Sequence, residues 1–166
     1  MRLIKAGACV DIIGDNIGGT PLSYAIATGK SDIVKLLLKR GASTESEDEV
    51  CRQLLISAAE EQQDAVVELL LDNRADIDPG TPLIYAIINR NESTVKLLLD
   101  RGANANIGIK GSETPLIYAV SARANGIVKL LFGRGANVNL SMEDGKTPLS
   151  YAAQRCHGGI IKIATR

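Results

Sequence analysis

Apolar positions along the chain fall into short runs of helical spacing that alternate with turn residues. One kind of run reads Thr-Pro-Leu-(Ser/Ile)-Tyr-Ala and occurs at Thr20–Ala25, Thr81–Ala86, Thr114–Ala119 and Thr147–Ala152. The other combines Ile or Val with Leu, as in Ile33–Leu38, and ends at a Gly-Ala pair. Threonine is a good N-cap, proline fits the first helical turn, and glycine ends a helix in the left-handed conformation. The pattern therefore predicts pairs of short helices joined by turns.

The Thr-Pro phrase recurs at a fixed spacing, and its last three copies begin 33 residues apart. The step from Thr20 to Thr81 is 61 residues because it contains a degenerate copy, Gln53–Ala58, and because the connection at Asp76–Gly80 is five residues short. A period of this length indicates one two-helix unit stacked on itself, since a single pair cannot bury both of its apolar faces. We therefore expect an all-α solenoid of stacked antiparallel helix pairs with projecting turns.

The repeat register predicts a single domain over residues 1–166. We expect a partial repeat over 1–14, complete repeats over about 15–47, 48–75, 76–108 and 109–141, and a partial repeat over 142–166. Both ends cut through a repeat, which favours a fragment of a longer protein. Apolar surface at an uncapped end also predicts high mobility after His157 and weak end-to-end self-association.

The two phrases recur in one register and resemble the ankyrin repeat over almost the whole chain. Thr-Pro-Leu-x-x-Ala, a break, Ile-Val-Lys-Leu-Leu-Leu and Gly-Ala-Asn-x-Asn match the family pattern. The family usually has histidine after Thr-Pro-Leu, whereas this chain has Ser23, Ile84, Ile117 and Ser150. This departure puts in doubt the hydrogen bonds that the histidine makes between repeats. The tyrosine that follows resembles fungal ankyrin arrays.

The resemblance implies a scaffolding or protein–protein interaction module that binds another protein through a concave groove. The composition agrees with an intracellular location, in the cytoplasm or nucleus, and the cut repeats at both ends favour a place within a larger protein. Groove positions carried over by register lie on projecting turns and on the exposed side of the first helices. On the turns they are Asn16, Ile17, Glu49, Val50, Arg52, Lys110, Glu113, Glu143, Asp144 and Lys146. On the first helices they are Glu60, Glu61, Asn89, Ser121, Gln154 and Arg155.

Charge and composition narrow the class of partner. Nineteen basic and nineteen acidic residues cancel, which argues against the basic footprint of a nucleic-acid-binding protein. No apolar stretch approaches the roughly 20 residues of a membrane-spanning helix, and the first residues do not form a secretion signal. We therefore expect neither nucleic acid nor a membrane as partner.

Candidate chemistry is sparse. Cys9, Cys51 and Cys156 are scattered and odd in number, which gives neither a disulfide nor a zinc framework. Cys156 adjoins His157, the sole histidine, but no further ligands lie nearby in the sequence. We predict no catalytic, cofactor or metal site and no enzymatic activity. The alternatives are an enzyme or small-ligand protein that uses an inter-repeat pocket, which a deep closed cavity would favour, and a purely structural spacer.

The second repeat differs from the others in charge. Its segment Glu45–Glu49, together with Glu60 and Glu61, is acidic and could steer a basic partner, although a merely solvated charge run fits the sequence equally well. If binding depends instead on Lys110, Lys146 and Arg155, the partner is expected to be acidic.

Overall fold

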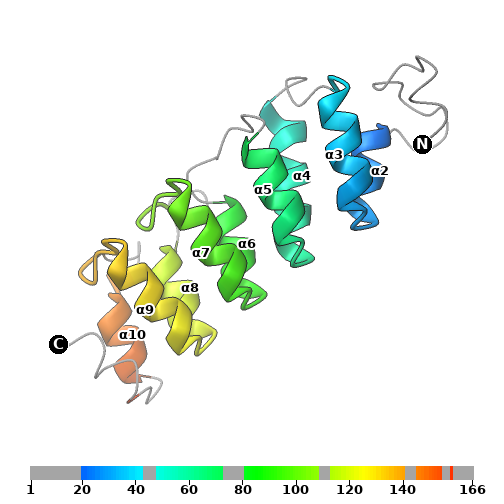
Figure 1. The fold of residues 1–166 in the computed structure, drawn as a ribbon. Helices are drawn as coiled ribbons and strands as arrows, with labels where there is room; N and C mark the ends of the chain where they lie inside the picture. The colour runs from blue at the N-terminus through cyan, green and yellow to red at the C-terminus, as the bar shows by residue number, and fades with distance from the viewer. Residues whose placement is uncertain are drawn as a thin grey trace. The chain divides into compact units, whose positions relative to one another are not determined.

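The computed structural model describes residues 20–42, 48–72, 81–108, 113–140, 145–154 and 158, and at residues 48–51 it describes the backbone alone. The described residues contain helices and turns and no strand (Figure 1), which confirms the predicted all-α class. The chain separates into two compact units, Met1–Asp76 and Ile77–Arg166. The division falls at the start of the connection that the sequence identifies as short. The predicted repeat boundaries stay predictions.

The first unit contains two helix pairs. Helices α2 (Pro21–Ala27) and α3 (Ser31–Lys39) form one pair, and α4 (Asp48–Glu60) and α5 (Asp64–Asp72) form the other. The first helices α2 and α4 pack together, as do the second helices α3 and α5 (Figure 1). This two-layer arrangement buries a continuous aliphatic core. Its fully buried large side chains are Leu22, Ile26, Leu37, Leu55 and Leu70.

The second unit repeats this arrangement. Its first helices α6 (Thr81–Ile88), α8 (Pro115–Ser121) and α10 (Pro148–Gln154) pack in succession. Its second helices α7 (Glu92–Asp100) and α9 (Asn125–Gly133) pack on each other and on the first helices of their own pairs (Figure 1). The fully buried large side chains are Leu83, Ile84, Ile87, Leu98, Leu116, Ile117 and Ile127.

The predicted threonine caps are confirmed at three helix starts. The Thr20 hydroxyl accepts a hydrogen bond from the Ser23 amide at 3.2 Å, and Thr114 does the same for Ile117 at 3.4 Å. Thr147 accepts from the Ser150 amide at 3.2 Å. Each hydroxyl satisfies one of the amides that a helix start leaves without an intrahelical partner.

The histidine position of the repeat is filled in two ways. Ser23 donates to the Thr20 carbonyl at 2.7 Å, and Ser150 donates to the Thr147 carbonyl at 2.9 Å, so both hydroxyls bond within their own helix start. Ile84 and Ile117 are fully buried. In α6 and α8, apolar packing therefore occupies the place where a histidine would form a polar link.

The two helices of each pair are joined by a short left-handed connection that closes on the alanine of the recurring phrase. The amide that follows the left-handed residue donates to this alanine's carbonyl, as in a Schellman motif. The bonds run from Lys30 to Ala25, from Gln63 to Ala58, from Asn91 to Ala86 and from Ala124 to Ala119, at 2.8–3.0 Å. The residues with positive φ are Gly29, Gln62, Arg90 and Arg123.

The second helices α3, α7 and α9 end as the sequence predicts. Gly41, Gly102 and Gly135 have φ values of 78°, 94° and 80°. The alanine after each glycine donates back to a leucine carbonyl at 3.0 Å, as in the bond from Ala136 to Leu131. Beyond this cap, the Asn106 side chain joins two neighbouring turns. Its amide nitrogen donates to the Gly135 carbonyl at 3.1 Å, and its oxygen accepts from the Asn137 amide at 2.7 Å.

The start of α4 corrects one prediction. Glu49, Val50 and Arg52 were expected on a projecting turn, but α4 begins at Asp48 and places all three inside a 13-residue helix. The degenerate copy has Gln53 and Leu54 where the other copies have Thr and Pro, so nothing forces the helix to begin at residue 53. Acidic residues also favour the positive end of the helix dipole, and this segment supplies two of them.

Candidate functional site

The predicted groove residues that the structure describes lie mainly at the C-terminal ends of the first helices. Glu60 and Glu61 are exposed at the end of α4. In the second unit, Asn89 follows α6, Ser121 ends α8 and Gln154 ends α10. Because these three helices pack in succession, their C-terminal ends are brought into one series. Their role in binding a partner stays a prediction.

The chemistry along this series varies from repeat to repeat. Asn89 is exposed, and its side chain donates to the Tyr85 carbonyl at 3.1 Å. Its neighbour Ile88 is 50% exposed, while Ser121 is half-buried and Gln154 is exposed. Elsewhere, Arg52 and Glu113 are half-buried and Lys146 is exposed. The ends of α6, α8 and α10 thus present the apolar Ile88 among the neutral polar side chains of Asn89, Ser121 and Gln154.

Several predicted residues cannot be placed. Asn16, Ile17, Lys110, Glu143, Asp144 and Arg155 lie outside the described residues. For Glu49 and Val50 the structure describes only the backbone, which lies in α4. Three further predictions concern segments outside the described residues. These segments are the short connection at Asp76–Gly80, residues 43–47 of the acidic run, and the residues after His157 apart from Gly158.

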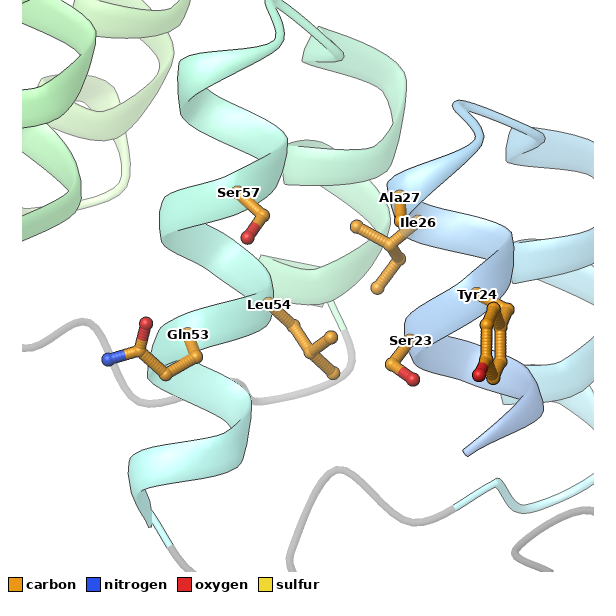
Figure 2. Close-up of a pocket in the computed structure, with 7 residues that line it drawn as sticks. All are labelled: Ser23, Tyr24, Ile26, Ala27, Gln53, Leu54 and Ser57. Carbon is orange, nitrogen blue, oxygen red and sulfur yellow. The ribbon is translucent and has the colours of Figure 1, made fainter. Parts of the chain in front are cut away.

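A cleft that the sequence did not predict lies between α2 and α4 (Figure 2). Its volume is about 290 Å³, its lining is mainly apolar, and it is open to solvent. Figure 2 shows Ile26 of α2 and Leu54 of α4 extending into the space between the two helices. The lining residues are Ser23, Tyr24, Ile26, Ala27, Gln53, Leu54 and Ser57. We call this feature the Ser57 cleft.

The Ser57 cleft follows from one departure from the repeat. Each of the four Thr-Pro copies carries tyrosine at its fifth position, whereas the degenerate copy carries Ser57. In the second unit the tyrosines at this position, Tyr85 and Tyr118, are half-buried. The smaller serine therefore leaves room against α2. The aligned phrase Gln53–Ala58 already contains this serine in place of tyrosine. From the sequence alone, the smaller side chain indicates only a degenerate repeat and does not predict a cleft.

The surroundings of Tyr118 in the second unit raise its pKa. Burial raises the pKa of Tyr118 above its ordinary value of 10.0, and the negative charges of Glu113 and ionised Tyr85 raise it further. The two rings therefore lie in one electrostatic environment, as expected for neighbouring repeats whose first helices α6 and α8 pack together.

The Ser57 cleft is small for a ligand pocket. Pockets that enclose small-molecule ligands typically measure about 300–1,000 Å³ and gather several polar groups. At about 290 Å³ and open to solvent, the cleft has the size of a site for a single side chain. It does not favour the alternative of a deep inter-repeat pocket.

Among the described residues, no group of three or more His, Cys, Asp or Glu is arranged to hold a metal ion. None of their helices is long and apolar enough to cross a bilayer.

Three models of the ankyrin repeat match consecutive parts of the chain. A model described as "Ankyrin repeat" matches residues 18–49, one described as "Ankyrin repeats (3 copies)" matches 45–109, and one described as "Ankyrin repeats (many copies)" matches 98–152. The matches run almost without interruption through both compact units.

Similar sequences occur in proteins from a virus, a fungus and a mammal. The ankyrin repeat protein FPV244 of fowlpox virus is 34% identical over 119 residues, which cover 60% of this chain and 18% of that protein. Ankyrin repeat protein nuc-2 of Neurospora crassa is 32% identical, with 64% of this chain and 10% of that protein covered. The B-cell lymphoma 3 protein homolog of Mus musculus is 32% identical, with 64% and 33% covered.

The chain therefore spans a third or less of these relatives. Their varied sources leave the fungal type a prediction. The helix pairs, the recurring phrases and the matches from residue 18 to residue 152 agree on one conclusion. The chain belongs to the ankyrin-repeat family, whose repeats generally serve as protein–protein interaction modules.

Proposed function

We propose that this chain binds another protein through the exposed side of its first helices, as a recognition module without catalytic activity of its own. The observation that supports the proposal most directly is the series of non-repeating side chains at the ends of α6, α8 and α10. The buried alanine recurs in all three helices, as Ala86, Ala119 and Ala152. The residues at the helix ends change from Ile88 and Asn89 to Ser121 and Gln154. A surface that varies on a constant scaffold is suited to the recognition of one partner.

The proposal includes an intracellular location and a role within a longer protein. Support comes from the scattered, odd-numbered cysteines, whose spacing predicts no disulfide framework, and from relatives much longer than this chain. The balanced charge supports a protein partner over nucleic acid.

The test is affinity capture with the tagged parent protein from its own cells, followed by quantitative identification of the retained proteins. Ile88→Glu combined with Asn89→Lys should reduce the amount of a specific partner that is captured about tenfold. The reason is that loss of a central anchor commonly costs more than about 1.4 kcal/mol of binding energy. Lys96→Glu, at an exposed site on the second helix α7, is the control and should retain the partner. Capture that depends on Lys96 and ignores the pair on α6 would contradict the proposal.

A further inference from the structure

The Ser57 cleft has the position and the lining of a missing aromatic side chain. Four repeats place a tyrosine where the second repeat has Ser57. The space left beside α4 is lined by the apolar side chains of Ile26 and Leu54, and Ser23 and Gln53 add polar groups. An aromatic ring suits a largely apolar site of this size, and a phenolic hydroxyl suits its polar groups.

The charge on the two helices that form the cleft is mainly negative. Helical spacing places Gln53, Ser57 and Glu60 on one face of α4, and Glu61 follows its last residue. Glu60 and Glu61 are exposed. Helix α2 carries no charged side chain, and the basic residue of α4 is Arg52. Among the described residues of this unit, Lys35 and Lys39 belong to the second helix α3, and Lys30 lies at the N-cap of α3, in the connection that follows α2.

We propose that the Ser57 cleft receives an aromatic side chain from a partner protein, within a segment that also carries Lys or Arg beside the aromatic residue. The partner thereby supplies the ring that the second repeat lacks. The acidic face of α4 attracts the flanking basic residues and speeds encounter, while burial of the ring holds the complex together. This inference rests on the proposed function and gives it a specific site and partner chemistry.

The sequence supplies its own blocking variant. Ser57→Tyr restores the residue of the other four copies and should fill the cleft without disturbing the fold, because the repeat already accommodates tyrosine at this position. Ser57→Ala is the matched control, which leaves the cleft open. Circular dichroism and thermal unfolding of both variants establish that each is folded before binding is measured.

The experiment is selection of a displayed random-peptide library on the whole chain, with the Ser57→Tyr variant as the competing surface. Peptides enriched by the wild-type chain should contain Phe, Tyr or Trp next to Lys or Arg. A labelled peptide made from the enriched sequence should bind the Ser57→Tyr variant at least about tenfold more weakly and the Ser57→Ala variant as well as the wild type. Combining Glu60→Gln with Glu61→Gln should slow association and flatten its salt dependence, whereas Asp32→Asn on α3 should not.

The remaining outcomes overturn the inference in separate ways. Enriched acidic peptides, or aromatic peptides that bind the Ser57→Tyr variant equally well, would show that the cleft is not the recognition site. Peptides whose binding is lost in the Ile88→Glu, Asn89→Lys variant would move recognition to the second unit and leave the proposed function standing. Absence of any enrichment would overturn the inference that the Ser57 cleft binds an aromatic side chain. The capture experiment on the parent protein would then decide the proposed function by itself.

Discussion

Single residues at the connections between paired helices hold strained backbone conformations. Gln62, Arg90 and Arg123 have φ values of 55–57°, in the left-handed region, while the first repeat has Gly29 at the same point with φ of 64°. A side chain in this region costs on the order of 1 kcal/mol relative to glycine. The conformation persists because the backbone bond to the recurring alanine closes the connection.

Arg123→Gly should therefore raise the free energy of unfolding by roughly 0.5–1 kcal/mol, since relief of strain exceeds the added flexibility of the unfolded chain. Urea unfolding followed by circular dichroism measures the change. Gly29→Ala reverses the substitution at the equivalent position and should lower stability by about 1 kcal/mol. A loss of stability in Arg123→Gly would mean that contacts of the arginine side chain outweigh the strain.

Tyr118 gives stability a dependence on alkaline pH. Its pKa is raised in the folded state by burial, by Glu113 and by Tyr85, so the fold favours the neutral phenol. Its contribution is fully present below pH 10.0, the ordinary value, and is lost as pH rises through the folded pKa. Stability should thus fall above about pH 10, and Tyr118→Phe should reduce this fall. Denaturant midpoints of the wild type and of Tyr118→Phe at neutral and alkaline pH test this prediction. An equal fall in stability in the two proteins would contradict it.

Among the elements, α4 separates what the sequence can predict from what it cannot. Helix starts at Thr20, Thr114 and Thr147 were predictable because Thr and Pro act locally on the first turn. The start of α4 at Asp48 was not, because a degenerate copy without these residues leaves the boundary to packing and to the charge at its first turn. The Ser57 cleft was hidden for a related reason, since its shape depends on the neighbouring helix.

The early start of α4 reverses the effect on stability that the repeat register predicts for a proline at position 54. By the repeat register alone, restoring the repeat sequence there with Gln53→Thr and Leu54→Pro would stabilise the second repeat. Because α4 begins six residues before Leu54, proline would remove an internal hydrogen bond and clash with the preceding turn, at a cost of about 3 kcal/mol. We expect Leu54→Pro to lower the melting temperature sharply. Leu54→Met, which keeps the volume of the 8%-exposed side chain, is the control and should change it little. A melting temperature raised by Leu54→Pro would instead support a helix that begins at residue 53.

At the scale of the whole molecule, the division into Met1–Asp76 and Ile77–Arg166 bears on cooperativity. Repeat arrays gain stability from each repeat and from its contacts with neighbours, so a weak repeat can lower one part of the array. The second repeat lacks the Thr-Pro start. We therefore expect the first unit to unfold at lower denaturant concentration than the second.

The absence of tryptophan from the chain provides a clean measurement. Tyr24→Trp reports on the first unit and Tyr85→Trp on the second, each as the only tryptophan present. Separate fluorescence midpoints, with the lower one from Tyr24→Trp, are the expected result, and circular dichroism of each variant checks that the substitution itself is tolerated. Coincident midpoints by all probes would instead show the single cooperative domain predicted from the repeat register.

The alanine-closed connections also determine how such an array can be lengthened. The bonds from Asn91 to Ala86 and from Ala124 to Ala119 begin and end inside one repeat, so a copied segment carries its own connection with it. Ile84 and Ile117 give adjoining first helices the same buried residue. A tandem duplication of residues 81–113 would thus insert a complete helix pair whose two faces already match their new neighbours. Growth by whole cassettes preserves the fold, while the exposed helix ends of the added copy become free to diverge toward a new partner.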